Sequence, residues 1–283
     1  MSDRAPAGAM PGHGVSVLVL TRNEEHDLPG CLASVNWCDD VHVFDSFSDD
    51  RTAEIATRFG ASVTQRRFDG YASQRNAALD GLRFRHPWVL ILDADERVPQ
   101  ALRDEIAATV AAGPDAAAFR IRRRDFFMGR WLKHAQISPF YVRLLRVGRG
   151  HYEREINEVL RVDGAVGELR EPFDHFPFSK GLAHWVAKHN VYSSMEAELI
   201  VRRGKGRCSV RRALFARDFH LRREHQKALF YRLPLRPLIK FVYMLFVRGA
   251  VLDGRAGLTY AALQAFYEYL IVLKTRELAG TGT

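Results

Sequence analysis

Cysteine is scarce in this sequence. The 283 residues include three cysteines, Cys31, Cys38 and Cys208, and no two of them form a CxxC pair. An odd number of widely spaced thiols argues against a disulfide framework or a zinc ribbon, so a reducing cytoplasm is the expected compartment. Residues 1–14 are rich in Ala, Gly and Pro and lack the apolar run of a signal peptide, so we expect a flexible tail there.

Glycine-rich phosphate-binding motifs are also missing. Neither GxGxxG nor GxxxxGK[ST] occurs, which excludes a dinucleotide fingerprint and a P-loop. Any phosphate groups would then be held by side chains and a metal ion. Acidic residues are outnumbered, 33 against 42 Lys and Arg, and the net charge of +9 indicates a polyanionic partner such as a phosphate ligand, a nucleic acid or a membrane surface.

Long uninterrupted hydrophobic runs are missing as well. The two most apolar stretches, Pro237–Leu252 and Leu258–Leu273, each fall short of the roughly 18 charge-free residues that a spanning helix needs. Charged residues interrupt them at Lys240, Arg248 and Glu268. We therefore expect helices that lie on a membrane rather than cross it, and packing on the rest of the chain or on a second subunit is the alternative.

Positive charge is concentrated ahead of these two stretches. Residues 202–240 contain thirteen Lys and Arg against two acidic residues, and a helical stretch, Ser179–Arg203, precedes them. We interpret residues 179–283 as a helical, basic and amphipathic region that associates with an anionic membrane surface. Binding of nucleic acid is the alternative, although no nucleic-acid motif accompanies the basic residues.

Short apolar runs alternate with helical patterns in the first half of the chain. Strands are predicted at Val15–Leu20, Val41–Phe44, Ala61–Thr64 and Trp88–Leu92, each followed by a helix, and weaker strand patterns follow at 117–121, 141–146 and 158–162. This order predicts an α/β fold with a mostly parallel sheet and helices on both faces. The ligand site of such a sheet lies at the carboxyl ends of its strands.

Two carboxylates follow the fourth predicted strand. The run LILDADE delivers Asp93 and Asp95 two residues apart at the end of an apolar strand. Hard oxygen ligands with this spacing suit Mg²⁺ or Mn²⁺ that bridges a diphosphate. A solvated acidic turn is the alternative, but the position at a strand end favours a functional site.

Further polar residues follow the first and second strands. Asn23 is expected to cap the first helix, and Thr21 and Glu24 lie beside it. Asp45 ends the second strand, where it can accept hydrogen bonds from a nucleobase or ribose. Arg75, at the start of the third helix, can pair with phosphate through its planar guanidinium, and a solvated helix face is the alternative.

Four of these segments together resemble a known family. The runs VLVLTRNEE, DSFSDDRT, QRNAAL and VLILDADER occur in this order. They are similar to those of the inverting family 2 glycosyltransferases, and most similar to the branch that contains lipopolysaccharide core β-1,4-glucosyltransferases. The resemblance is strong over residues 15–100 and continues more weakly to the Asp253-Gly254 turn.

The resemblance implies a glycosyltransferase-A fold for residues 15–178 and a role for each polar residue at the strand ends. It implies nucleotide contacts for Thr21, Asn23, Glu24 and Asp45, a diphosphate contact for Arg75, a ribose or metal contact for Asp93, and coordination of Mg²⁺ or Mn²⁺ by Asp95.

The family also implies a catalytic base downstream of these residues. Where this branch often has a His-Glu pair, the chain has Asn157 followed by Glu158. Glu158 is therefore our predicted base, with Glu155 as the alternative. His175 is expected to be a structural histidine, although some enzymes of this fold use a histidine as a third metal ligand.

The implied activity is transfer of a sugar from a nucleotide sugar, with UDP-glucose as the expected donor. The implied acceptor is a lipid-linked glycan or a lipopolysaccharide core, so the expected location is the cytoplasmic face of the inner membrane. A sugar-phosphate nucleotidyltransferase is an alternative enzyme, but the segment after the first strand lacks the glycine-rich loop that such enzymes use. A nucleic-acid-binding protein that uses residues 202–240 is the non-enzymatic alternative.

Overall fold

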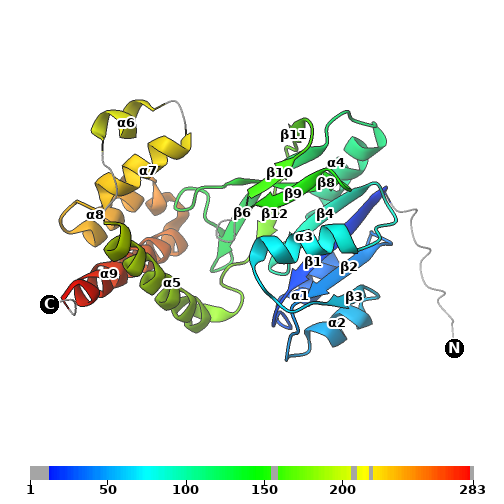
Figure 1. Ribbon diagram of the computed structural model, residues 1–283, viewed down its shortest axis with the longest axis horizontal. Helices are drawn as coiled ribbons and strands as arrows, with labels where there is room; N and C mark the ends of the chain where they lie inside the picture. The colour runs from blue at the N-terminus through cyan, green and yellow to red at the C-terminus, as the bar shows by residue number, and fades with distance from the viewer. Residues whose placement is uncertain (1–12, 154–158, 205–208, 217–218, 281–283) are drawn as a thin grey trace. The chain divides into compact units, whose positions relative to one another are not determined.

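Residues 13–153, 159–204, 209–216 and 219–280 are described by the computed structural model of the chain. They form two units (Figure 1). The first unit contains the chain up to Phe126 and Ser138–Ser179, and the second contains Phe127–Ile137 and the chain from Lys180 onward. The boundary after Ser179 lies beside the one drawn from the sequence, but the segment Phe127–Ile137 was not expected in the second unit.

A mixed β-sheet forms the centre of the first unit. Its main strands run in the order β3 (Ser62–Gln65), β2 (Val41–Asp45), β1 (Val15–Thr21), β4 (Trp88–Asp93), β8 (Phe140–Arg146) and β6 (Ala118–Phe127). The first four are mutually parallel, and β8 is antiparallel to both of its neighbours. The four predicted parallel strands are confirmed. β1, β2 and β4 are almost entirely buried, as in a sheet that is covered on both faces, whereas the edge strand β3 is mostly exposed.

Helices cover the two faces of this sheet. One core contains residues of α1 (Leu28–Ser34), α2 (Thr52–Arg58) and α4 (Gln100–Ala111), and the other contains residues of α3 (Tyr71–Gly81). The predicted cap at Asn23 is wrong, because Asn23 has a left-handed backbone with φ of 56° and α1 begins only five residues later.

Short strands extend the sheet beyond its predicted part. β12 (Phe173–His175) is parallel to β6 and antiparallel to β5 (Glu96–Arg97). β11 (Val166–Glu168) also pairs with β6, and β9 (Gly150–Glu153) forms a hairpin with β10 (Val159–Val162). None of β5, β9, β11 and β12 was predicted.

The second unit is helical. In chain order it contains the short β7 (Arg130–Trp131), α5 (Gly181–Arg203), α6 (Val210–Phe215), α7 (Phe219–Phe230), α8 (Arg236–Val242), a π turn (Tyr243–Val247), a 3₁₀ turn (Ala250–Asp253) and α9 (Gly254–Gly280). The buried Asp253 carboxylate accepts hydrogen bonds from the backbone N–H groups of His134 (2.9 Å) and Ala135 (2.7 Å). Asp253 therefore attaches the segment 127–137 to the helices.

The helix α9 is longer than the apolar stretch predicted from the sequence. Within the part of the chain that the structure describes, Ala250–Gly280 is one helical stretch long and apolar enough to cross a membrane by length and composition. A core helix of a folded unit meets the same criterion. Glu268 on α9 is buried and pairs with the buried Arg236 of α8 (2.9 Å), as expected of a helix packed inside a protein.

Candidate active site

The loops after β1 and β2 are joined at the carboxyl edge of the sheet. Thr21 lies opposite Asp45 in the β1–β2 pairing, and its hydroxyl donates to the Asp45 carboxylate (2.9 Å). The fully buried Asp45 also accepts hydrogen bonds from the backbone and hydroxyl of Ser48 and from Gln65. Protein donors therefore surround Asp45, so the residue fixes the shape of this loop.

Asn23 and Glu24 complete the connection between the same two loops. The backbone N–H of Asn23 donates to the Ser48 hydroxyl, and that of Glu24 donates to the Thr52 hydroxyl, both at 2.8 Å. The Asn23 side-chain oxygen accepts from the backbone N–H of Asp49 (3.0 Å). These bonds explain why Asn23 cannot cap α1: its side chain holds the neighbouring loop instead.

Two arginines hold the carboxylate of Asp93 at the end of β4. Arg75 donates to one Asp93 oxygen (2.8 Å) and Arg143 donates to the other (2.9 Å). Arg143 also pairs with Glu96 (2.5 Å), whose second oxygen accepts from the backbone N–H of Asp93 (3.0 Å). Four charged side chains thus form one connected cluster, and three of them, Arg75, Arg143 and Glu96, are buried.

Burial and charge act in opposite directions on the carboxylates of this cluster. Burial disfavours the ionised form of Asp93, but Arg75 and Arg143 hold its pKa well below the usual range. Burial raises the pKa of Glu96 above its usual range, and the attraction of Arg143 only partly offsets this effect. Asp93 is therefore an ionised carboxylate whose charge is already balanced by the protein.

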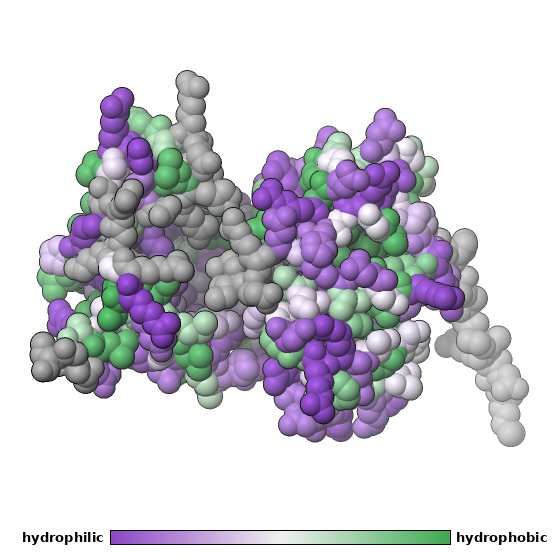
Figure 2. Space-filling model, in the orientation of Figure 1, coloured by the Kyte–Doolittle hydropathy of each residue, from purple (hydrophilic) through white to green (hydrophobic). Residues whose placement is uncertain are grey.

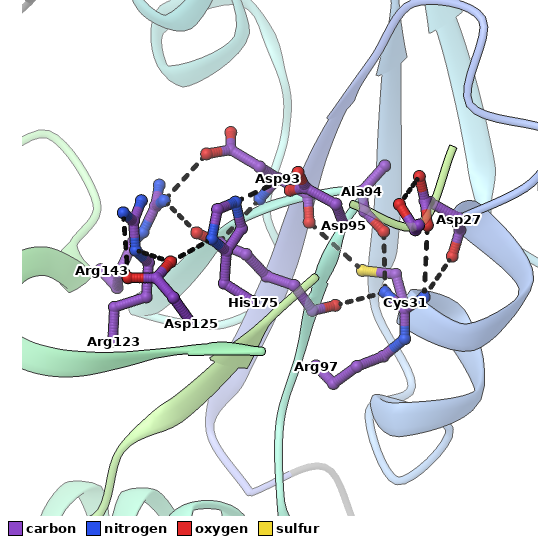
Figure 3. Close-up of polar contacts among 12 residues, drawn as sticks. Asp27, Cys31, Asp93, Ala94, Asp95, Arg97, Arg123, Asp125, Arg143 and His175 are labelled. Carbon is purple, nitrogen blue, oxygen red and sulfur yellow. Dashed lines mark hydrogen bonds and ion pairs between the residues drawn. The ribbon is translucent and has the colours of Figure 1, made fainter. Parts of the chain in front are cut away.

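Asp95 has different surroundings, shown in Figure 3. One Asp95 oxygen lies 3.2 Å from Nε2 of His175, and Nδ1 of the same ring lies 2.5 Å from an oxygen of the buried Asp125. Arg123 in turn lies 3.0 Å from Asp125. Burial alone would lower the pKa of His175, but the hydrogen bonds to Asp125 and Asp95 raise it to about 9.

The strand register explains why these groups meet. In the β5–β12–β6 pairing, His175 lies opposite Glu96 on one side and opposite Asp125 on the other. Asp95 immediately precedes β5. Residues from three distant parts of the sequence therefore come together through backbone pairing alone.

Arg97 fixes the turn that carries Asp95. Its guanidinium donates to the carbonyl oxygens of Ala94 and Asp27, both at 2.9 Å (Figure 3). A Cβ atom at Gly30 would lie 2.5 Å from the Arg97 guanidinium, so the close approach of Arg97 to α1 depends on glycine there. No role was predicted for Arg97 or for Gly30.

The donor set of Asp95 and His175 fits a divalent cation that also binds a diphosphate. Among the described residues, no group of three or more His, Cys, Asp or Glu side chains is arranged to hold a metal. Mg²⁺ typically keeps several waters and binds through one or two carboxylates and substrate phosphates. A metal-bound histidine usually donates its other N–H to a carboxylate, which is the position of Asp125.

The predicted site residues thus fall into two neighbouring groups. Thr21, Asn23, Glu24 and Asp45 shape the loops after β1 and β2. Asp93 and Asp95 lie at the end of β4, the strand next to β1, and Arg75 reaches Asp93 from α3. Glu158 and its alternative Glu155 lie outside the described residues.

Three buried charged residues of the site, Glu96, Asp125 and Arg143, had no predicted role. Glu96 and Arg143 lie inside segments that resemble the family, but the resemblance assigned no role to either side chain. Asp125 is the single acid that follows an arginine run at the end of β6. An acidic residue that stands alone beside several arginines is the sequence feature that could have marked Asp125 as a site residue.

Comparison with known proteins defines the class to which this fold and this site belong. The chain matches the family described as Glycosyl transferase family 2 over residues 16–175, more than half of its length, and therefore belongs to that family. It is a glycosyltransferase with the glycosyltransferase-A fold, which decides against the nucleotidyltransferase and nucleic-acid-binding alternatives as the class of protein.

Relatives extend the similarity beyond the matched region. The lipopolysaccharide core biosynthesis glycosyltransferase LpsC of Rhizobium meliloti (strain 1021) is 28% identical over 94% of this chain and 93% of its own length. An uncharacterized glycosyltransferase of Rickettsia typhi is 26% identical over 94% of this chain and 87% of its own. Both alignments include the helical second unit.

Solved structures show more distant likeness. A structure of S. aureus TarS 1–349 covers 95% of this chain and 92% of that one, with 15% identity and a TM-score of 0.43. Glucosyl-3-phosphoglycerate synthase from Mycobacterium tuberculosis, in complex with Mn²⁺ and UDP-glucose, covers 41% of this chain and 44% of that one, with 21% identity and a TM-score of 0.32.

Proposed function

We propose that this glycosyltransferase moves a sugar from a nucleotide sugar to a membrane-linked glycan by a metal-dependent, inverting displacement. The observation that carries the proposal is the Asp95–His175 pair, which lies beside an Asp93 carboxylate already neutralised by two arginines. Asp95 instead pairs with a histidine that can itself be a metal ligand, so we assign the cation to Asp95 and His175. Its position at the carboxyl edge of the sheet is where ligands of such folds bind.

The donor binds along the ends of β1, β2 and β4 in this proposal. The loops of Thr21, Asn23 and Glu24 receive the nucleotide, and Asp45 acts by holding those loops in shape. Asp93 contacts the ribose, and Arg75 lies near the diphosphate. UDP-glucose is the donor we propose, because the motifs resemble the glucosyltransferase branch of the family.

Mg²⁺ or Mn²⁺ is the proposed cofactor. Asp95 and Nε2 of His175 would hold the cation, and Asp125 would keep the other ring nitrogen protonated and the ring oriented. Asp93 is a less suitable ligand, because Arg75 and Arg143 occupy both of its oxygens. A bound cation would supply charge neutralisation to the leaving diphosphate, a stabilisation worth several kcal/mol.

The proposed base is Glu158. A carboxylate there would accept the proton of the acceptor hydroxyl as this oxygen attacks the anomeric carbon and the nucleoside diphosphate leaves from the opposite side. The bond from the acceptor oxygen to the sugar forms as the bond to the diphosphate breaks, so inversion needs one displacement. No cysteine nucleophile is required, consistent with the burial of Cys31.

The proposed acceptor is a lipid-linked or lipopolysaccharide-core glycan, and the proposed location is the cytoplasmic face of the inner membrane. The name of the relative LpsC, similar over nearly the whole chain, supports the acceptor class. Charge supports the location: residues 180–283 contain 19 Lys and Arg against 7 Asp and Glu. Such a segment is attracted to anionic lipid headgroups.

A donor panel tests the proposed reaction. We expect release of the nucleoside diphosphate from one nucleotide sugar, measured without acceptor, in the presence of Mn²⁺. With an acceptor, Glu158→Gln should lower transfer by about 100-fold or more while affinity for the donor changes little. If Glu155→Gln shows this loss and Glu158→Gln does not, Glu155 is the base. Turnover of none of the nucleotide sugars would contradict the proposal.

A further inference from the structure

A row of large apolar side chains lies exposed on α8 and the π turn that follows it. Leu238, Val242 and Phe246 form one line at four-residue steps, and Ile239, Tyr243 and Val247 form a second line beside it. Each of the six residues keeps between 36% and 72% of its surface exposed. We call these six residues the 238–247 surface. Hydrophobic residues are visible on the outside of the second unit, next to hydrophilic ones (Figure 2).

The π turn keeps these two lines on one side. In an α-helix, a step of four residues overshoots a full turn by about 40°, so such lines wind around the axis. The backbone N–H of Arg248 donates to the carbonyl oxygen of Tyr243 (2.9 Å), five residues earlier, which makes this turn wider than an α-helical one. The wider turn reverses the drift and returns Phe246 and Val247 to the side of Leu238 and Ile239.

The opposite side of the same segment is fixed inside the second unit. Arg236 and Met244 are buried, and the ion pair of Arg236 with Glu268 joins α8 to α9. The orientation of the segment is therefore set by its buried side. The exposed part of the 238–247 surface, which is largest at Phe246 and Val247, lies outside this packing.

Charge indicates what covers this surface. Residues 180–283 carry a formal charge of +12, which exceeds the +9 of the whole chain, so residues 1–179 carry −3. Arg232 precedes the 238–247 surface in the sequence and Arg248 follows it directly. A second copy docked through this surface would bring two strongly positive units together, which electrostatic repulsion opposes. An anionic lipid leaflet offers both complementary charge and an apolar interior.

We propose that the 238–247 surface inserts into the anionic leaflet that carries the acceptor, with Phe246 and Val247 entering deepest. This inference rests on the proposed function, which supplies the membrane in question: the one that carries the acceptor. It assigns the membrane contact to α8 and the π turn rather than to the apolar stretch 258–273. Tyr243 suits the same boundary, because aromatic residues with a polar end favour the headgroup level. The long helix α9 then supports the segment from behind.

Flotation with vesicles of equal parts phosphatidylglycerol and phosphatidylcholine tests the proposal on the full chain, without donor or acceptor. We expect the wild type to float at about 50 mM salt and less at about 500 mM. Phe246→Asp combined with Val247→Asp should lower the apparent partition coefficient at least about tenfold. A matched control, Val147→Asp combined with Val166→Asp, adds the same charge to exposed residues of the first unit and should float like the wild type.

A second measurement does not depend on a disruptive variant. The tryptophan of Phe246→Trp should add fluorescence that lipids with brominated acyl chains quench. The tryptophan of Val166→Trp should add fluorescence that these lipids do not quench. A wild type that stays unbound, a double variant that binds equally, or an unquenched Phe246→Trp would overturn the proposal. The surface would instead belong to a contact with a second copy if the wild type is a dimer that does not bind vesicles, and if the substitutions at Phe246 and Val247, but not the control substitutions, dissociate that dimer. Vesicle binding without any nucleotide-sugar turnover would contradict the proposed function and leave this contact standing.

Discussion

Asp125 holds the imidazole of His175 by a hydrogen bond of 2.5 Å to Nδ1. This contact directs Nε2 of the same ring toward Asp95, so Nε2 is the nitrogen whose proton a bound cation would replace. Asp125 is therefore a positioning residue, since it acts on the metal through the histidine.

Replacing Asp125 by Asn should weaken the metal site without removing a ligand. The substitution keeps the size of the side chain but removes the charge that makes the imidazole a stronger donor. We expect Mn²⁺ affinity in the presence of UDP to fall by about 10- to 100-fold, measured by isothermal titration calorimetry. Asp174→Asn is the matched control, because Asp174 is next to His175 on β12 and pairs with Arg124 rather than with the histidine. Equal affinities for the two variants would remove Asp125 from the metal site.

Arg143 should be important for the stability of the fold. Replacing it by Met leaves the buried Glu96 without its closest cation and Asp93 with only one arginine. We expect a loss of about 3–5 kcal/mol in the free energy of unfolding, measured by urea denaturation. Arg149→Met removes an exposed ion pair with Asp163 and should cost less than about 1 kcal/mol. Similar losses for both variants would mean that the buried cluster does not stabilise the fold.

Glu268 should give the stability a defined pH dependence. Burial raises its pKa, and the charges that face it are Arg236, Lys240, Glu196 and Lys227. The folded chain therefore keeps this proton to a higher pH than the unfolded chain does. As pH rises above the usual range of Glu, ionisation favours the unfolded state and the folded state loses stability.

The comparison with Glu268→Gln isolates this effect, because Gln does not titrate. We expect the unfolding free energy of the wild type minus that of the variant to decrease between about pH 5 and about pH 7.5. Glu198→Gln, at an exposed carboxylate of α5, should show no such trend. An increase of the difference with pH for Glu268→Gln would show that ion pairing with Arg236 outweighs burial.

The parallel strands and their polar ends were predictable from the sequence. The apolar runs of the first, second and fourth predicted strands, each followed by a helical pattern, are enough to place Thr21, Asp45 and Asp93 at one edge of a sheet. The period and the length of these runs carry this information. The run that ends in Asp93 also places Asp95, two residues later, at the same edge of the sheet.

The partners of Asp95 were not predictable in the same way. β5 and β12 have two and three residues, which is too short for a hydrophobic period. The pairing of β12 with β6 and with β5 joins segments about 50 and about 80 residues apart in sequence. The contact of His175 with Asp125 depends on that pairing. In the second unit, the i+5 hydrogen bond of the π turn leaves no mark in composition, so the alignment of Phe246 with Leu238 was not predictable either.

Metal-dependent turnover of UDP-glucose tests the central assignment most directly. The wild type should release UDP with Mn²⁺, stop in excess EDTA and recover when Mn²⁺ is restored. Asp95→Asn should reduce this rate by at least about 100-fold, whereas Asp104→Asn, at an exposed carboxylate on α4, should leave it unchanged. Full turnover in EDTA, or a rate for Asp95→Asn equal to that of Asp104→Asn, would contradict the assignment of Asp95 to the metal.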